Sequence, residues 1–201
     1  RMRKEWNVSR ERVLLYAGTL GDEDLDGLLA QGLKDLPSSG FVVWALACDT
    51  TPQDQERLRT FKEKIEISRL GSRYRVYVNI PPAQMRAVLA GADIGLLPWR
   101  EELPTSIPVK LFDYAGTGIS TLAKSGKNSA LATFLEAHSD LGTSTSEWSM
   151  FASYLQAWMK KPLVASVSRE KRAREAHRTF DRLPPIQAAI VAWKTSEEKR
   201  E

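Results

Sequence analysis

The feature that most constrains the fold is an alternation of short apolar runs with longer amphipathic stretches. Strands that are apolar along most of their length belong to a sheet that is covered on both faces. Helices between such strands predict parallel β-α-β crossovers. The sequence therefore predicts an α/β fold, a doubly wound parallel sheet of the Rossmann-like kind. Its strands are expected at residues 12–20, 41–48, 74–80, 93–98, 119–123 and 141–145.

The stretches between these runs carry helix signals. Residues 22–36 repeat leucine at helical spacing behind an acidic first turn. Thr51 and Pro52 supply an N-cap and a first helical residue. The remaining helices before the last third of the chain are predicted from Pro81-Pro82 onward, at 108–115 and at 129–138.

The last third of the chain reads as helical. Trp148, Phe151, Leu155 and Met159 form a stripe that is typical of core packing. The basic run 169–178 also contains acids, which favours a solvated helix face, with a membrane surface as the alternative.

A final helix is predicted after Pro184-Pro185, followed by a charged tail. The expected division is a Rossmann-like domain over residues 1–165 and a helical C-terminal extension over 166–201 that packs on it.

Composition narrows the classes of ligand. The net charge of +4 suits an anionic small ligand, and the basic residues are too mixed with acids to indicate nucleic acid. The single cysteine, Cys48, allows no disulfide within the chain, which favours a reducing, cytoplasmic location. His138 and His177 are far apart and no Cys/His spacing indicates a metal site. No signal peptide and no apolar run of about 20 residues is present.

Ligands of doubly wound sheets bind at the carboxyl ends of the strands. The first such loop begins at Gly18, which lets the backbone approach a ligand closely. Gly18 and Gly21 do not complete a dinucleotide fingerprint, and the acids at 22–24 repel phosphate. A tight turn before an acidic helix start explains this loop equally well.

The stretch PTSIPVKLFDYAGTG at 104–118 is more informative. Pro108 lies where a helix can begin, which leaves neighbouring N–H groups free for an anion. Asp113 follows in about the second turn, where a carboxylate can accept hydrogen bonds from sugar hydroxyls. The plainer alternative is that Asp113 caps a turn or pairs with Lys110.

A helical wheel of this stretch puts Val109, Phe112 and Ala115 on one side. It puts Lys110, Asp113 and Tyr114 toward the other. The wheel therefore predicts an apolar face that contains Val109 and a polar face that contains Tyr114.

The segments ADIGLLPWR and PVKLFDYAGTGISTLA carry a resemblance. Together they resemble the C-terminal half of the retaining GT-B glycosyltransferases of glycosyltransferase family 4, in which a strand and a loop precede P-x-K-x-x-E-Y-x-x-x-G. The resemblance covers about residues 10–195, with YAGTL at 16–20 in the place of the family's first glycine loop.

The resemblance implies a donor site. Asp113 matches the acid that binds the ribose, and the first acid of the family's pair is replaced by Thr105. The family's cations of the first loop are replaced by Thr19 and acids, so Arg100, Lys110, Lys124 and Lys127 are the candidates to take their place. The implied donor-binding residues are Gly18, Thr19, Asn79, Ile80, Thr105, Ser106, Ile107, Lys110, Leu111 and Asp113, with no metal and no cofactor.

The implied function is that of the donor-binding half of a hexosyltransferase-like glycosyltransferase. It would bind a nucleotide-sugar, UDP-linked by expectation, and meet its acceptor through an N-terminal domain that this chain lacks. The chain alone would then be inactive, and the whole enzyme cytoplasmic or peripheral to a membrane. The alternative is a GT-B-like interaction or scaffold domain without transferase activity, which Thr105 and the acidic first loop favour. A nucleotide-sugar epimerase ranks last, because no acid and base set for it is visible.

The remaining singular residues have structural interpretations. Trp44 and Trp99 are expected at strand ends, as core or as the wall of the site. We expect His138 at a helix end or in a loop, and Cys48 as a small buried residue.

Overall fold

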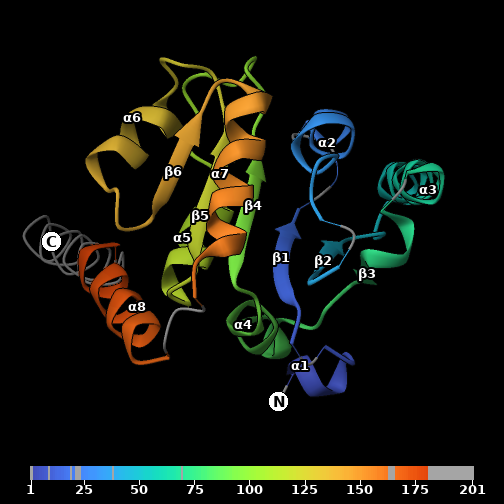
Figure 1. Ribbon diagram of the computed structural model, residues 1–201, viewed down its shortest axis with the longest axis horizontal. Helices are drawn as coiled ribbons and strands as arrows, with labels where there is room; N and C mark the ends of the chain where they lie inside the picture. Colours follow the sequence, from blue (N-terminus) through green and yellow to red (C-terminus); the bar gives the residue numbers. More distant parts are fainter. Residues whose placement is uncertain are drawn as a thin grey trace, which may run out of the picture.

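The computed structural model describes residues 2–8, 10–18, 20, 24–37, 39–68, 70–162 and 166–180. Its centre is one six-stranded parallel sheet with the order β3-β2-β1-β4-β5-β6 (Figure 1). This order is that of a doubly wound sheet in which the chain reverses direction across the sheet between β1 and β4. The predicted fold class is confirmed.

Each strand overlaps a predicted apolar run and differs from it by at most three residues at either end, and β5 extends one residue beyond its run, to Lys124. The first strand stops at Ala17. The third stops at Val78, because the next residue, Asn79, adopts a left-handed backbone (φ 54°). The strands are β1 (Arg12–Ala17), β2 (Phe41–Ala47), β3 (Tyr74–Val78), β4 (Ile94–Pro98), β5 (Ser120–Lys124) and β6 (Gly142–Thr145).

The helices follow the predicted positions, with one correction at residues 22–36. Among the described residues of this stretch, 24–36, the regular structure consists of α2 and the π-helical turn η1. Asp24 acts as the N-cap and accepts a hydrogen bond from the Gly27 N–H (2.8 Å). The bounds are α1 (Met2–Glu5), α2 (Leu25–Gly27), η1 (Leu28–Gly32), α3 (Pro52–Ile67), η2 (Gly71–Arg73), α4 (Pro82–Gly91), α5 (Val109–Gly116), α6 (Ala130–Ala137), α7 (Trp148–Lys160) and α8 (Ser166–Phe180).

The N-terminus of α3 matches the sequence prediction. Thr51 is the N-cap and Pro52 the first helical residue, and Thr51 and Asp54 form a reciprocal capping box. The final helix predicted after Pro184-Pro185 lies outside the described residues.

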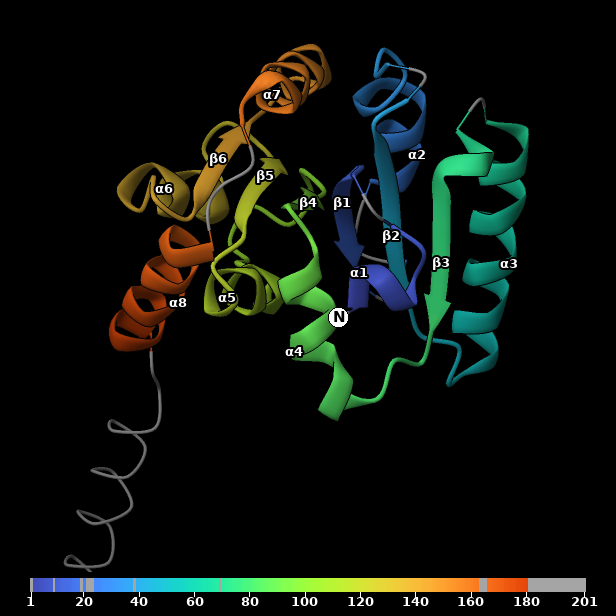
Figure 2. The same ribbon diagram turned by 60° about the horizontal axis from the view of Figure 1, so that its bottom comes forward.

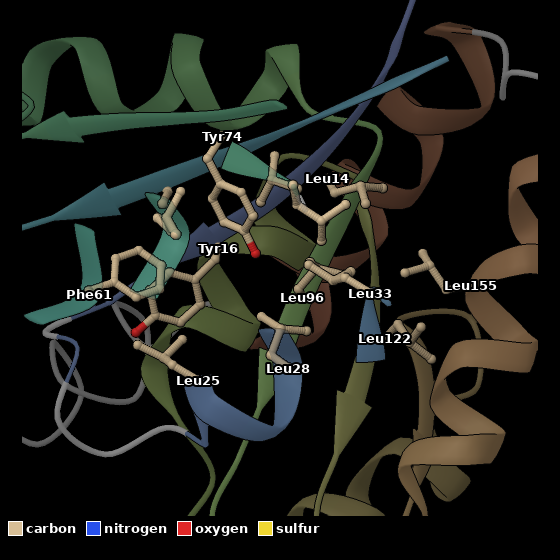
Figure 3. Packing of buried hydrophobic residues seen from close by; sticks show 14 of the residues in the cluster. Leu14, Tyr16, Leu25, Leu28, Leu33, Phe61, Tyr74, Leu96, Leu122 and Leu155 are labelled. Carbon is tan, nitrogen blue, oxygen red and sulfur yellow. The ribbon is translucent and has the colours of Figure 1, made fainter. Parts of the chain in front are cut away.

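Alternate residues of the central strands point to opposite faces of the sheet. Leu14 and Leu96 pack with α2, η1, α3 and α7 on one face, and Figure 3 shows part of this cluster, including Tyr16 and Phe61. Leu15 packs with α1 and α4, and Leu97 with α5, α6 and α8, on the other face. Helices that follow β1 and β2 therefore cover one face and those that follow β3, β4 and β5 cover the other.

Helix α5 is oriented differently from the wheel prediction. Tyr114 is fully buried, whereas Val109 is 70% exposed. The cause is that the helix begins at Val109, with Pro108 as an extended N-cap residue, and that β4 offers Gly95 as a gap for the tyrosine ring. A Cβ atom on Gly95 would lie 2.3 Å from the ring of Tyr114.

The stripe of α7 is core, as predicted: Trp148, Phe151 and Leu155 are buried and Met159 packs against the same cluster. The basic run of α8 is only in part a solvated face.

Helix α8 lies beside α5 (Figure 2). Its Arg169 donates to the carbonyl of Ala90 (3.1 Å), and Arg172 donates twice to the carbonyl of Gly118 (3.1 and 2.7 Å). These two guanidinium groups fix the helix on backbone carbonyls at the ends of α4 and α5.

The predictions for four single residues are settled by burial and position. Trp44 is buried in the middle of β2, not at its end, and Trp99 is buried directly after β4. His138 is the C-cap of α6, as expected. The prediction of a buried Cys48 is wrong: the residue is exposed, because it follows the last residue of β2 and leaves the sheet.

Candidate functional site

The carboxyl ends of β1 and β4 meet where the chain changes direction across the sheet. We call this place, at Ala17 and Pro98, the switch-point edge. The ladder between β1 and β4 consists of two residue pairs, Leu14 with Ile94 and Leu15 with Gly95. The last residues of β1 are therefore not paired with β4, which is where doubly wound folds bind their ligands.

Tyr114 joins the two strands beyond the end of this ladder. Its ring lies against Gly95 of β4, and its hydroxyl accepts a hydrogen bond from the N–H of Ala17 (3.1 Å). Burial strongly raises the pKa of this phenol, so it stays neutral. Sequence reasoning missed this contact and placed Tyr114 on the polar side of α5.

Lys110 lies one turn before Tyr114 and reaches toward β1. Its ammonium nitrogen is 5.3 Å from the centroid of the Tyr16 ring. A cation from α5 thus lies next to the last residues of β1, across the switch-point edge.

Asp113 is on the exposed side of α5, one turn from Lys110. Neighbouring groups nevertheless desolvate its carboxyl, which raises its pKa, and the charge of Lys110 partly lowers it again. Its carboxylate is therefore less well hydrated than that of an ordinary surface acid, which favours a polar ligand.

Asn79 and Ile80 lie at the carboxyl end of β3, on the other side of β1. Asn79 exchanges two hydrogen bonds with Asp49, which follows β2: the Asp49 N–H donates to Oδ1 (3.2 Å) and the amide of Asn79 donates to the Asp49 carboxylate. The loops after β2 and β3 are thereby linked. Ile80 is half-buried and packs against the core under α4.

The loop from Trp99 to Pro108 is held at several points. The N–H of Trp99 donates to the carbonyl of Lys124 (2.7 Å), and its indole donates to the carbonyl of Leu103 (3.3 Å). The N–H of Ala130 donates to the carbonyl of Pro104 (2.6 Å). The loop between β4 and α5 is therefore tied to β5 and to the start of α6.

The three loop residues of the predicted site differ in their surroundings. Thr105 is exposed, Ile107 packs against the core of α5 and α6, and the N–H of Ser106 donates within the loop to the carbonyl of Leu103 (3.3 Å). The N–H of Ser106 is thus already engaged within the loop.

Most of the predicted donor-binding residues come to one edge of the sheet. Gly18 follows β1 and donates its N–H to the carbonyl of Leu46 (3.1 Å). Thr19 lies outside the described residues. Leu111 is not at the edge with its side chain, which is fully buried in the core, so only its backbone belongs to the predicted site.

A cavity of about 210 Å³ lies beside the switch-point edge, between the start of α2 and α3. Among the described residues its wall includes Leu20, Asp24, Arg57, Phe61 and Arg100. Of the residues predicted for the donor site, the wall contains the candidate cation Arg100. Acids and bases alternate around it: Lys64, also in the wall, is paired with Asp26 (2.6 Å). We place the site at the strand ends, because a balanced wall does not select an anion.

One of the candidate cations, Lys124, is a buried charged group at this edge, and no pattern in the sequence indicated its burial or its partner. Lys124 is the last residue of β5, and its side chain is 8% exposed. Its ammonium nitrogen lies 2.5 Å from a carboxylate oxygen of Glu101, in the loop that follows β4. Its ammonium also lies 5.8 Å from the ring centroid of Trp148.

The described residues offer neither a metal cluster nor a membrane span. They contain no group of three or more metal-binding side chains. Within the same residues, every helix is too short or too polar to cross a lipid bilayer.

Comparison with known proteins gives relatives in structure only. No family model and no curated protein matches the sequence. Among solved structures, HepE of Anabaena in complex with UDP has a TM-score of 0.73 at 16% identity, with 97% of this chain and 51% of that chain covered.

Two further structures have the same architecture. Sucrose-phosphate synthase of Thermosynechococcus elongatus has a TM-score of 0.74 at 16% identity, and the match covers 99% of this chain and 49% of the synthase chain. WaaG, a glycosyltransferase involved in lipopolysaccharide biosynthesis, has a TM-score of 0.59 at 17% identity, with 94% and 49% covered.

The chain spans about half the length of each of these proteins. At such identities the likeness establishes the fold. The chain thus has the Rossmann-like α/β fold of one half of the GT-B glycosyltransferase structures.

Proposed function

We propose that this chain is the donor-binding half of a glycosyltransferase, which moves a sugar from a nucleoside diphosphate to an acceptor. The observation that carries the proposal is the position of Lys110 and Asp113. Both come from the stretch PVKLFDY, and Lys110 lies beside the last residues of β1 at the switch-point edge. A structure of the same fold, HepE, was solved with UDP, which supports a UDP-linked donor.

The site residues have distinct roles in this proposal. Asp113 accepts hydrogen bonds from the ribose hydroxyls, and its partly desolvated carboxylate makes these bonds stronger than at an open surface. Lys110 offsets the charge of the diphosphate, which becomes the leaving group when the sugar is transferred. Asn79 and Ile80, at the end of β3, contact the base.

The acceptor belongs to a second domain in this proposal. Sugar transfer needs a site closed from both sides, so the chain alone binds the donor without turning it over. A cytoplasmic location, with or without contact to a membrane surface, is part of the same proposal and rests on the single cysteine, Cys48.

Calorimetric titration with UDP, UMP and uridine tests the proposal directly. We expect UDP to bind the wild-type chain and Asp113→Ala to weaken it roughly tenfold, the size of one hydrogen bond to a charged group. The loss should disappear when 2′,3′-dideoxy-UDP replaces UDP, because that ligand lacks the hydroxyls that Asp113 would hold.

The matched control is Glu136→Ala, which removes an exposed acid from α6. It should leave the affinity for UDP unchanged. A wild-type chain that binds none of the common nucleoside diphosphates would contradict the proposal.

A second candidate is an interaction domain that keeps the fold without the chemistry. Thr105 favours it, because it is an exposed hydroxyl at the position where the resembling family has an acid. Transfer of sugar by the whole protein would exclude this candidate.

A further inference from the structure

Lys124 is the most deeply buried cation near the switch-point edge. It is the last residue of β5 and is paired in the ladder with Pro98, the last residue of β4. Its side chain is 8% exposed. Burying an ammonium group is costly unless an anion compensates it, so this lysine needs a counter-ion at the end of the sheet.

The counter-ion in the structure is Glu101. Its carboxylate accepts from the ammonium of Lys124 at 2.5 Å, yet 57% of the Glu101 side chain is exposed. Glu101 belongs to the loop between β4 and α5, the same loop that carries Thr105 and Ser106. A single carboxylate on the rim can leave Lys124 at low cost, because water solvates it again.

Asp24 is near enough to be considered as a second counter-ion, since it contacts the same indole as Lys124. Its carboxylate oxygens, however, accept from the N–H of Gly27 (2.8 Å) and from the indole of Trp148 (3.2 Å). Asp24 is therefore occupied as the cap of α2. The charge of Lys124 is balanced by Glu101, and Trp148 forms an apolar wall beside the ammonium.

Lys124 also occupies a fixed position. Its carbonyl accepts from the N–H of Trp99 (2.7 Å), and the next residue, Ser125, is fully buried and bonds through its hydroxyl to Ser144 (2.7 Å). A cation held in this way needs no ordering when an anion arrives, which strengthens binding.

We propose that Lys124 binds the diphosphate of the nucleotide, and that Glu101 occupies its place until the phosphate displaces it. The inference rests on the proposed function and adds to Lys110 a second cation that offsets the phosphate charge. It explains how a chain whose first loop holds acids can still bind a diphosphate: the cation comes from β5 instead. A phosphate group is a stronger competitor for an ammonium than one exposed carboxylate, since it carries more charge and more acceptor oxygens.

The test compares two variants with opposite expected signs by calorimetry at fixed salt. Lys124→Gln should lower the affinity for UDP about tenfold to a hundredfold, which is the range for a lost hydrogen bond to a charged group. The same variant should leave the affinity for uridine unchanged. Glu101→Gln should raise the affinity for UDP severalfold, because the carboxylate that competes for Lys124 is gone. A lysine that only anchors the loop through Glu101 predicts weaker or unchanged binding in both variants.

Two exposed residues serve as controls: Glu102→Gln removes the neighbouring acid, and Lys62→Gln removes a cation from the outer face of α3. Each should change the affinity for UDP less than Glu101→Gln or Lys124→Gln does. If Lys124→Gln does not fold, Glu101→Gln decides alone, since its side chain lies mostly in solvent.

The outcomes separate this inference from the function on which it rests. If the wild-type chain binds UDP and Glu101→Gln does not bind it more tightly, the proposed role of Lys124 is overturned, and the proposed donor site is not affected. Absence of any nucleotide binding by the wild-type chain overturns both.

Discussion

Tyr74 and Tyr114 show how much the surroundings of one hydroxyl matter. Both phenols are buried, and burial raises the pKa of each. The hydroxyl of Tyr114 accepts from the N–H of Ala17, whereas that of Tyr74 has no hydrogen-bond partner among the described residues. A buried polar group without a partner costs free energy that a paired one does not.

Removing these two hydroxyls should therefore have opposite effects on the free energy of unfolding. We expect Tyr74→Phe to stabilise the protein by about 1 kcal/mol and Tyr114→Phe to destabilise it by about 1–2 kcal/mol, since the latter leaves the Ala17 N–H unpaired. Urea unfolding of both variants measures the difference. Equal effects of the two substitutions would contradict the assigned contacts.

Asp113 links stability to pH. Desolvation raises its pKa above 3.8, so the folded chain holds this proton at a pH at which the unfolded chain has released it. The ionised carboxylate therefore destabilises the fold at neutral pH, and this cost fades as the pH falls through the folded-state pKa toward 3.8 and below.

Asp113→Asn should thus raise the melting temperature modestly at pH 7, and the gain should vanish near pH 3. Thermal unfolding followed by circular dichroism across this range checks the sign, with Glu136→Gln on α6 as the exposed comparison. The same variant should bind UDP less tightly, because a site residue is kept for its ligand at some cost in stability. A gain that grew toward low pH would rule out the assigned cause.

At the scale of elements, the packing of α5 against β4 depends on the absence of a side chain at Gly95. Tyr114 can reach Ala17 only because Gly95 leaves space on β4, and a Cβ atom there would stand 2.3 Å from the aromatic ring. The contact determines how closely α5 approaches the switch-point edge. It also determines where Lys110 and Asp113 are presented.

Gly95→Ala should therefore destabilise the protein by about 1–3 kcal/mol or more, the range for overpacking in a core. It should also lower the affinity for UDP. Gly126→Ala is the matched control, because the nearest atom to its new Cβ would be 4.0 Å away. Denaturant unfolding and titration with UDP on both variants measure the two effects. Equal stability of the two variants would show that α5 can shift freely.

For the whole molecule, the proposed donor site predicts stabilisation by ligand. A ligand that binds only the folded state at a hundred times its Kd adds about 2.7 kcal/mol. For a chain of this size that corresponds to a rise in melting temperature of roughly 5–10 °C. Differential scanning fluorimetry with UDP measures it, with uridine expected to give a smaller shift. An unchanged melting temperature in millimolar UDP would contradict nucleotide binding.

Much of the architecture was predictable from the sequence. The six strands overlap the predicted apolar runs. Thr51 and Ser129 begin their helices as N-caps, and His138 ends its helix as a C-cap, all at the predicted positions. The reason is local: apolar periodicity and capping residues report how a stretch is buried without reference to its neighbours. The same local signals bring Lys110 and Asp113 to the carboxyl edge of the sheet, because they follow a strand.

The remaining features were decided by the tertiary structure. The wheel put Val109 on the apolar side of the helix and Tyr114 on the polar side, and Cys48 was expected to be buried. Both predictions failed because periodicity does not show which neighbour offers space. The pairing of Lys124 with Glu101 joins residues 23 positions apart.

By itself, then, the sequence determined the doubly wound sheet and which loops follow the carboxyl ends of its strands, since strand and helix formation depend on residues close together in the chain. Only the tertiary structure decided that Tyr114 joins β1 to β4 and that Lys124 is a buried cation balanced by Glu101. Such contacts depend on the packing of distant segments. The packing of distant segments cannot be inferred from the pattern of residues within any one of them.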